Sequence, residues 1–263
     1  MFMHAIRHIV AAALFATAAS ASAGPIAISS FSFNNNVADS GTNPMSMIPN
    51  GAVTYTDTAP AAAGGMAVNF DGNSNISATG AMRTGGDFSI AFWMKTGMNS
   101  YGGDYWYSGN GLVDAETGGH TTDWGISLLN NKVAFGMGGW DTTLQSTRTV
   151  NDNQWHLVSA TWAMNTGAMS LYLDGVLDST TTTQAGQYRN GQNFLTFGSI
   201  AIPNNFYVGS LAHVQVFDTV LSAADVAALN APAAVPEPGS IALMGLGLAG
   251  LLARRRKAGK PQA

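Results

Sequence analysis

Residues 87–95 read DFSIAFWMK, an almost unbroken apolar run of the length of one β-strand. The side chains of a strand alternate between its two faces. Phe88, Ile90 and Phe92 therefore share one face of the predicted strand, while Trp93 points to the other. This pattern predicts a strand whose inner side packs against a second sheet.

Short apolar or alternating runs of the same kind recur from residue 24 onward, separated by clusters of Gly, Asn, Asp, Ser and Thr, and almost no stretch shows helical periodicity. The sequence therefore predicts an all-β fold, a two-sheet antiparallel sandwich, whereas two small barrels would need a linker that we do not find. The predicted strands span residues 26–33, 66–70, 88–95, 111–114, 124–129, 132–137, 155–162, 168–173, 195–200 and 206–217.

Local signals predict the connections between these runs. Hairpin turns are expected at Asn130-Asn131 and at Asp174-Gly175, because these residues tolerate positive φ. One short helix is expected after Ser222, a capping residue that has Asp225 three positions on. Residues 59–65 and 180–186 are predicted to be surface loops.

Composition and charge exclude several classes of protein. Of the 263 residues only 10% are charged, while 46% are hydrophobic. Residues 24–234 contain five Lys and Arg against fourteen Asp and Glu, a net charge of −9. So acidic a domain cannot collect a phosphate backbone, which excludes nucleic acid as a partner. The chain has no cysteine, which excludes disulfides, thiolate metal sites and cysteine nucleophiles.

Residues 1–23 have the layout of a secretory signal peptide. A weakly basic start around Arg7 precedes an apolar run over residues 9–16, and Ala21-Ser22-Ala23 ends the segment. The run is far shorter than the ~20 residues that a membrane anchor needs. We therefore expect export through the Sec machinery, with cleavage after Ala23.

Residues 233–263 form a second distinctive end. Pro236-Glu237-Pro238 precedes an apolar stretch over residues 239–253, and the basic cluster Arg254-Arg255-Arg256 follows. A helix of fifteen residues is about 22 Å long, which is short against a hydrocarbon core of ~30 Å, but flanking arginines can snorkel to the headgroups. The stretch predicts a transient anchor in the inner membrane, with the basic cluster on the cytoplasmic side.

This C-terminal order of motif, short helix and arginines resembles the PEP-CTERM sorting signal. The resemblance implies recognition by an exosortase and removal of the tail near Pro236, Glu237 and Pro238. It also implies that the product ends at the cell surface or in the extracellular matrix of a Gram-negative bacterium that makes extracellular polysaccharide.

Five motifs between the two ends follow one another in a recognisable order: residues 67–72 (AVNFDG), 87–95 (DFSIAFWMK), 153–158 (NQWHLV), 171–175 (LYLDG), and 207–217 together with 221–225 (LSAAD). This succession resembles a LamG-like jelly roll of the concanavalin A-like lectin and glucanase superfamily. The resemblance covers nearly all of residues 24–232 and implies one domain of two antiparallel sheets, one of them concave. The motifs are explained by packing, so they do not specify a ligand.

The sequence offers little for catalysis. Glucanases of this superfamily use two glutamates and an aspartate that alternate on one strand. Here Glu116 is the single glutamate of the domain, and Asp114 could share its strand face, but no third acid accompanies them. His120, His156 and His213 lie far apart, with no nucleophile elbow and no zinc-like spacing. We therefore expect no enzyme.

Structural Ca²⁺ is the one cofactor that the resemblance implies. Family members hold it with aspartate and backbone oxygens at a sheet edge, and such hard oxygen ligands suit the ion. Asp39, Asp71 and Asp218 are the candidate ligands. The alternative is that Asp71-Gly72 is simply a turn and that Asp218 caps the end of a strand.

Residues 97–111, called here the aromatic loop, contain the candidate ligand-binding residues Tyr101, Asp104, Tyr105, Trp106 and Tyr107. Aromatic rings in a polar loop can stack on sugar rings, while Asp104 and Asn110 could hydrogen-bond to hydroxyls. Trp124 and Trp140 could extend this surface. The alternative is that the aromatics fold back over the sandwich as a small cluster.

The sequence thus predicts an exported, non-catalytic surface or matrix protein. The domain is expected to bind extracellular polysaccharide or a surface protein. Two alternatives remain: a polysaccharide-active glycoside hydrolase or lyase on the same fold, and a structural surface component without a ligand.

Overall fold

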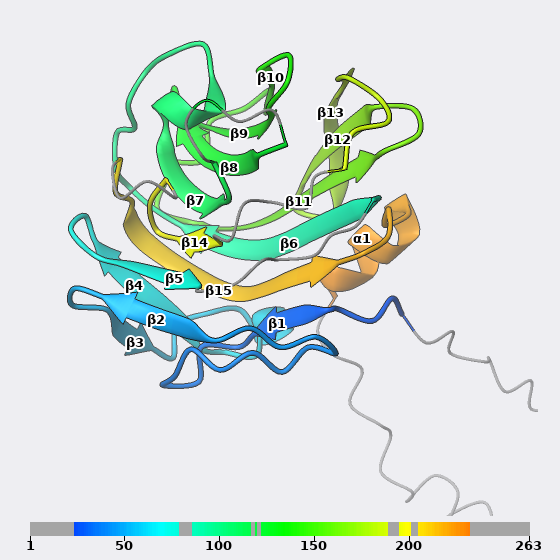
Figure 1. The fold of residues 1–263 in the computed structure, drawn as a ribbon. Coiled ribbons are helices and arrows are strands. Elements are labelled where there is room, and N and C mark those ends of the chain that lie inside the picture. The colour runs from blue at the N-terminus through cyan, green and yellow to red at the C-terminus, as the bar shows by residue number, and fades with distance from the viewer. Residues whose placement is uncertain are drawn as a thin grey trace, which may run out of the picture.

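The computed structural model describes residues 24–78, 86–116, 119, 122–188, 195–200 and 205–231. Within these residues the chain forms two antiparallel sheets that lie face to face, as Figure 1 shows. One α-helix and two short 3₁₀ helices lie outside the sheets.

The described strands divide into a larger and a smaller sheet. The larger sheet has the order β13-β12-β11-β6-β15-β4-β3, and β1 also pairs with β15. The smaller sheet has the order β10-β9-β8-β7-β14-β5-β2. The strands of the larger sheet are β1 (Ser29–Phe31), β3 (Thr54–Thr56), β4 (Ala67–Asp71), β6 (Phe88–Lys95), β11 (Trp155–Ala163), β12 (Ala168–Leu173), β13 (Val176–Thr182) and β15 (Val208–Phe217). Those of the smaller sheet are β2 (Met47–Asn50), β5 (Asn75–Ala78), β7 (Asn110–Asp114), β8 (Trp124–Leu129), β9 (Lys132–Met137), β10 (Thr142–Gln145) and β14 (Thr196–Phe197).

Strand β6 lies at the centre of the larger sheet, between β11 and β15. Its inward residues Phe88, Ile90 and Phe92 are fully buried in the core between the sheets. Trp93 belongs to a separate apolar cluster on the outer face, so the alternation predicted from the sequence is confirmed. Phe88 packs against two buried tryptophans, with ring centroids 5.2 Å from Trp124 and 5.7 Å from Trp162.

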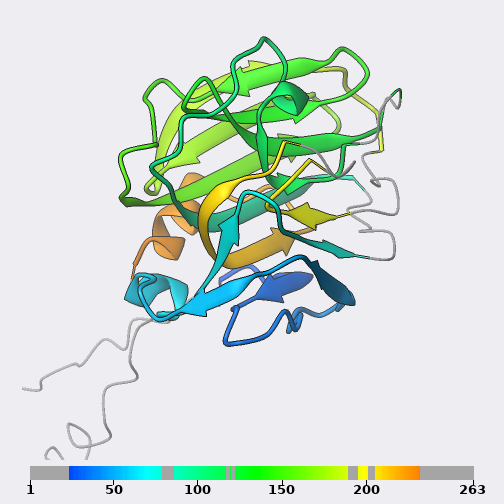
Figure 2. The ribbon, with the colours of Figure 1, turned by 90° about the vertical axis from the view of Figure 1, so that its left-hand side faces the viewer.

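The outer face of each sheet carries a different cover. Helix α1 (Ala223–Leu229) and the 3₁₀ helix η1 (Ala61–Ala63) lie on the larger sheet. The 3₁₀ helix η2 (Trp106–Ser108) lies on β8 and β9 of the smaller sheet. Figure 2 shows these covers on opposite sides of the molecule.

The predicted sandwich, turns and helix are confirmed. Asn130 and Asn131 both have positive φ, as do Asp174 and Gly175. Helix α1 begins at a capping box in which the Ser222 side chain accepts from the Asp225 N–H and the Asp225 carboxylate accepts from the Ser222 N–H.

Some boundaries were wrong. Residues 180–182 continue β13 rather than belonging to a loop, and η1 lies within the predicted loop 59–65. Strands β2, β3, β5 and β10 were not predicted, and of β13 only the turn that leads into it was, because these strands are short or carry polar residues.

The predicted processing residues Ala23, Pro236, Glu237, Pro238, Arg254, Arg255 and Arg256 lie outside the described residues. The same holds for the apolar stretch 239–253. Among the residues that are described, none of the helices has the length and apolar character needed to cross a bilayer.

Candidate functional site

The aromatic loop crosses the outer face of the smaller sheet, and Trp106 fixes it there. The Trp106 N–H donates to Thr143 Oγ1 of β10 at 3.1 Å, and its carbonyl accepts from Ser127 Oγ of β8 at 2.6 Å. Its indole lies over Gly136, where an added Cβ would collide with the ring. At Gly125 an added Cβ would meet the Asp114 carboxylate first and the edge of the ring at 2.9 Å. The two glycines thus leave room on the sheet for an indole.

Trp106 is therefore not a ligand-stacking residue as predicted. Its side chain is 0% exposed and packs against Leu129 and Ala134. Trp124, one of the two suggested extensions, is also fully buried, and it lies in the core between the sheets. Trp140, the other, is 66% exposed, so its part in an extended surface stays a prediction. Both indoles are buried because a place for each exists in the fold, over the glycines of β8 and β9 for Trp106 and between the sheets for Trp124.

Two tyrosines of the loop do face solvent. Tyr101 is 56% exposed and Tyr105 is 44% exposed. Tyr105 stacks on the half-buried Tyr107, with ring centroids 5.3 Å apart and an angle of 12° between the planes. Tyr107 in turn meets the edge of Trp106 at 4.8 Å. The predicted folded-back cluster and the predicted exposed rings thus occur together, in two layers.

Hydrogen bonds hold this loop in one conformation. The Tyr101 N–H donates to Asn110 Oδ1 at 3.0 Å, and the Tyr101 carbonyl accepts from the Asn130 N–H at 3.0 Å. Asn130 Nδ2 donates to the Gly103 carbonyl at 2.9 Å. Asn110 is buried and engaged with backbone, so the expected contact between Asn110 and a hydroxyl is not available, whereas Asp104 is exposed.

The acids Asp114 and Glu116 lie beside this loop but do not form an open pair. Asp114 is 0% exposed, and its Oδ1 accepts from the Glu116 N–H at 2.8 Å. Burial raises the pKa of Glu116, and the charges of Asp123 and Asp141 raise it further. A raised pKa suits a general acid, but a second carboxylate without exposed surface cannot approach a glycosidic bond.

Two of the three predicted calcium ligands, Asp71 and Asp218, lie at opposite ends of one long strand. Asp71 is paired with Val208 at the start of β15, and Asp218 follows the end of this ten-residue strand. At ~3.4 Å per residue these two aspartates are separated by roughly 30 Å. In the part of the chain that the structure describes, no group of three or more His, Cys, Asp or Glu is placed to hold a metal ion.

Two of these aspartates serve the turns in which they lie. Asp39 Oδ1 accepts from the N–H groups of Ser30 and Gly41, and its Oδ2 accepts from that of Met45. Asp71 Oδ1 accepts from the Asn73 N–H and the Ser74 hydroxyl, and these bonds lower the pKa of Asp71. The alternative of a simple turn therefore describes Asp71 well, and calcium binding at any single position stays a prediction.

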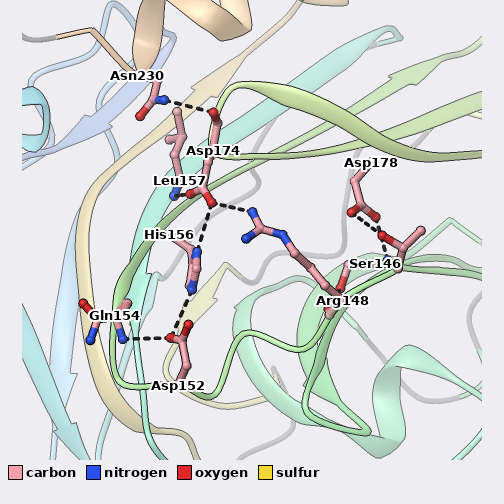
Figure 3. A network of polar contacts seen from close by, with 10 residues as sticks. Ser146, Arg148, Asp152, Gln154, His156, Leu157, Asp174, Asp178 and Asn230 are labelled. Carbon is pink, nitrogen blue, oxygen red and sulfur yellow. Dashed lines mark hydrogen bonds and ion pairs between the residues drawn. The ribbon is translucent and has the colours of Figure 1, made fainter.

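The most extensive charged network lies on the larger sheet, around His156 (Figure 3). His156 Nδ1 lies 3.1 Å from Asp174 Oδ2, and His156 Nε2 lies 3.1 Å from Asp152 Oδ1. Arg148 forms an ion pair with Asp174, whose Oδ1 also accepts from the Leu157 N–H. The hydrogen bond to Asp174 raises the pKa of the His156 imidazole, the bond to Asp152 adds to this effect, and burial opposes it.

This network connects the strands of the larger sheet to helix α1. Burial opposes ionisation of Asp174, but the hydrogen bonds from His156 and Arg148 outweigh it and lower the pKa of Asp174 to about 2. The Asp174 carbonyl accepts from Asn230 Nδ2 at 2.9 Å, which ties the end of α1 to the β12–β13 turn. Two sequence motifs contribute to this network: NQWHLV, which contains His156, and LYLDG, which contains Asp174 eighteen residues later. Arg148 gave no signal.

The remaining histidines do not join this network. His120 lies outside the described residues. His213 lies on the outer face of the larger sheet, where burial lowers the pKa of its imidazole. No arrangement of a nucleophile with His156 or His213 is evident among the described contacts.

Comparison with known proteins places this geometry in a family. The model of the concanavalin A-like lectin/glucanases superfamily matches residues 70–227, and that of the PEP-CTERM protein-sorting motif matches residues 234–257. A rat protein named "Sushi, von Willebrand factor type A, EGF and pentraxin domain-containing protein 1" is 30% identical over 150 residues. That match covers 54% of this chain and 4% of the rat protein.

Solved structures share the fold at low sequence identity. Domain 4 of a GH43 extracellular arabinanase from Geobacillus stearothermophilus, solved in complex with arabinotriose, is 17% identical with a TM-score of 0.59. That match covers 80% of this chain and all of that domain. The botulinum neurotoxin serotype G binding domain is 18% identical with a TM-score of 0.57, and the match covers 78% of this chain and 50% of the toxin chain.

The matched family model spans most of both sheets, from the end of β4 to the middle of α1. The chain therefore belongs to the concanavalin A-like lectin/glucanases superfamily and carries a C-terminal PEP-CTERM protein-sorting motif.

Proposed function

We propose that this protein is an exported, non-catalytic carbohydrate-binding protein whose ligand lies on the aromatic loop. The observation that carries the proposal is the pair of exposed tyrosines, Tyr101 and Tyr105, on a loop anchored by hydrogen bonds to the smaller sheet. Rings held in place before binding lose little conformational entropy when a sugar stacks on them.

The chemistry of the loop suits a sugar better than a charged ligand. A tyrosine offers an apolar face to the C–H groups of a sugar ring and a hydroxyl at its edge. Asp104 lies between the two tyrosines in sequence and is exposed, so its carboxylate can accept from sugar hydroxyls. The acids Glu116, Asp123 and Asp141 near Tyr107 would repel an anionic chain, which favours a neutral polysaccharide.

The same face argues against cleavage. Trp106 covers the centre of the outer face of β8 and β9, and Asp114 is buried next to it. A glycosidase of the retaining or inverting type needs two carboxyl groups on either side of an accessible bond. We therefore assign binding rather than hydrolysis to the ligand surface.

The proposal includes a route of export and processing. Residues 1–23 would direct Sec-dependent export, and the PEP-CTERM motif implies processing by an exosortase after transient anchoring in the inner membrane. The product would then act at the cell surface or in the matrix of a Gram-negative bacterium, with extracellular polysaccharide as its partner. The arabinotriose complex of the similar arabinanase domain supports a carbohydrate ligand for this fold, without indicating which one.

Affinity electrophoresis of the full chain in gels that contain neutral polysaccharides tests the proposal. The double variant Tyr101→Ala/Tyr105→Ala should weaken retention by at least about tenfold, since each ring contributes stacking energy. Tyr188→Ala is the matched control, because Tyr188 is equally exposed but lies off the loop. Unchanged retention of the double variant, or release of reducing sugar from any of the polysaccharides, would overturn the assignment.

A further inference from the structure

A pocket on the outer face of the larger sheet lies far from the aromatic loop. Its floor comes from three neighbouring strands, with Leu157 on β11, Trp93 on β6 and Gln215 on β15. Its walls come from Ala62 of η1 and from the C-terminal end of α1, where Leu229 and Ala231 line it. The pocket has a volume of about 140 Å³ and is open to solvent.

A β-bulge brings two polar groups into this otherwise apolar pocket. Ala212 pairs with Trp93 and Gln215 pairs with Ala91, so β15 has one extra residue between these pairs. The extra residue places His213 on the outer face together with Ala212, and His213 takes a left-handed φ of 45°. Bulges that redirect a side chain and strained non-glycine residues both concentrate at functional sites.

The side chains of His213 and Gln215 are uncharged and keep groups that can hydrogen-bond to a ligand. Burial lowers the pKa of His213, so its imidazole is neutral near pH 7 and offers one donor and one acceptor. One of these groups is used in a hydrogen bond to the backbone of Ala62. Among the described residues, nothing else hydrogen-bonds to the His213 ring or to the side-chain amide of Gln215. The described lining contains no Asp, Glu, Lys or Arg, so a charged ligand finds no counter-ion here.

The walls are held rigidly by the network around His156. Asp174 accepts from the Leu157 N–H in the floor, and its carbonyl accepts from Asn230, between the wall residues Leu229 and Ala231. The capping box at Ser222 fixes the other end of α1. The network therefore connects the floor of the pocket to the end of α1 that forms one wall.

The size and lining of the pocket define the class of ligand. A cavity of ~150 Å³ holds one benzene molecule, so this pocket has room for one six-membered ring. The accessible apolar surface comes mainly from the walls, from Ala62, Ala228 and Leu229, since Trp93 in the floor is only 7% exposed. His213 and Gln215 offer neutral hydrogen-bonding groups toward hydroxyls. We propose that this pocket is a second carbohydrate site, which binds a single neutral pyranose unit independently of the aromatic loop.

The consequence is a protein with two ligand surfaces on opposite sides of the sandwich. One exposed tyrosine surface would contact a polysaccharide along its length, and one pocket would hold a single unit at a chain end or branch. Such an arrangement allows one molecule to link two polysaccharide chains, which raises the apparent affinity for a matrix through effective concentration.

The test uses the full chain and three probes: the methyl glycosides of glucose, galactose and mannose in pyranose form. Saturation-transfer NMR and the fluorescence of the tryptophans, with Trp93 in the pocket floor, report binding. At least one glycoside should bind, and Gln215→Ala should weaken its binding by about tenfold because the amide hydrogen bonds are lost. Ala228→Phe, which places a ring at the pocket wall, should abolish binding.

Two controls separate this proposal from the previous one. Gln154→Ala removes an exposed glutamine outside the pocket and should leave glycoside binding unchanged. The double variant Tyr101→Ala/Tyr105→Ala should lose polysaccharide retention but keep glycoside binding. Circular dichroism of each variant confirms that it is folded.

Three results would overturn the pocket proposal without touching the aromatic loop. The first is that none of the three glycosides binds to the full chain. The second is that a glycoside binds but folded Gln215→Ala and Ala228→Phe bind it as well as the parent does. The third is that phenol or indole saturates the pocket while the glycosides do not compete, which would assign it to an aromatic side chain.

Discussion

The outer faces of the two sheets are covered in different ways. On the smaller sheet, Gly125 and Gly136 leave a bare patch that Trp106 fills, and the tyrosines lie on top of it. On the larger sheet, Leu229 of helix α1 packs against the cluster of Trp93 and Leu157, and a small pocket remains beside this contact. Whether an outer face retains a pocket thus depends on how the covering segment packs on it, and not on the sheet alone.

The covers also differ in how they are fastened. The aromatic loop depends on one buried indole and on neutral hydrogen bonds from Asn110 and Asn130. The end of α1 depends on an ionic network through Asp174, His156 and Arg148. The first kind of attachment is insensitive to pH, whereas the second should respond to it at both extremes.

The largest expected effect comes from removing the Trp106 indole from the outer face of the smaller sheet. Trp106→Ala should lower the free energy of unfolding by about 3 kcal/mol, because it leaves a cavity over two glycines. The loop should detach as well, so polysaccharide retention should fall with stability. Urea unfolding measures the first effect and affinity electrophoresis the second.

Trp140→Ala is the matched control for that variant. Trp140 is 66% exposed in the turn between β9 and β10, so its loss should change the free energy of unfolding by no more than about 0.5 kcal/mol. Equal destabilisation by both variants would show that the indole of Trp106 does not fasten the loop.

The next largest effect concerns the ionic network that attaches the end of α1 to the larger sheet. Asp174→Asn removes the charge that His156 and Arg148 share, and should cost about 2 kcal/mol at pH 7. The folded pKa of Asp174 is about 2, below the unfolded value, so the contribution is complete above about pH 4 and is lost as the pH falls toward 2. Urea unfolding between pH 7 and pH 2 should therefore show the two proteins converging in acid.

Asp104→Asn supplies the comparison, since Asp104 is exposed in the aromatic loop. Its loss should change the free energy of unfolding at pH 7 by no more than about 0.5 kcal/mol. A constant difference between parent and Asp174→Asn down to pH 2 would mean that the lost bonds are not ionic.

The two histidines of the larger sheet should give opposite responses to pH. The bond to Asp174 raises the folded pKa of His156, so its contribution is complete below about pH 6.5 and is lost as the pH rises through the raised value. Burial lowers the folded pKa of His213, so its contribution is present in neutral solution and is lost as the pH falls. Unfolding of His156→Gln and His213→Asn across pH 5 to 9 separates the two, and a shared slope would contradict this account.

The smallest expected effect concerns the start of α1. Ser222→Ala removes the capping box and should cost about 1 kcal/mol. It should also weaken glycoside binding in the pocket, whose wall is the same helix. Thr180→Ala on the exposed part of β13 is the control, with a change within about 0.5 kcal/mol.

How much the sequence could predict depended on whether the decisive interactions were local. Strands β6, β8, β9 and β12 match their predicted bounds, since apolar alternation and turn residues define them. Strand β13, with the sequence VLDSTTT, was only partly foreseen because its residues are exposed at a sheet edge. Pairing with β12 makes it a strand, and pairing is not visible in a local window.

The candidate sites depended on contacts between distant residues. Nothing in the loop sequence distinguishes Trp106 from Tyr105, and the room for the buried ring is left by Gly125 and Gly136, nineteen and thirty positions after Trp106. The pocket required a bulge at His213, which shifts the alternation of β15 by one residue. Neither signal is contained in composition or periodicity.

The most direct test of the central claim is an NMR titration of the isotope-labelled protein with neutral oligosaccharides of arabinose, xylose and glucose. The account predicts that at least one of them shifts the amide signals of Tyr101, Asp104 and Tyr105 and is recovered intact at the end of the titration. Shifts confined to other surfaces, or shortened oligosaccharides in the recovered material, would contradict it.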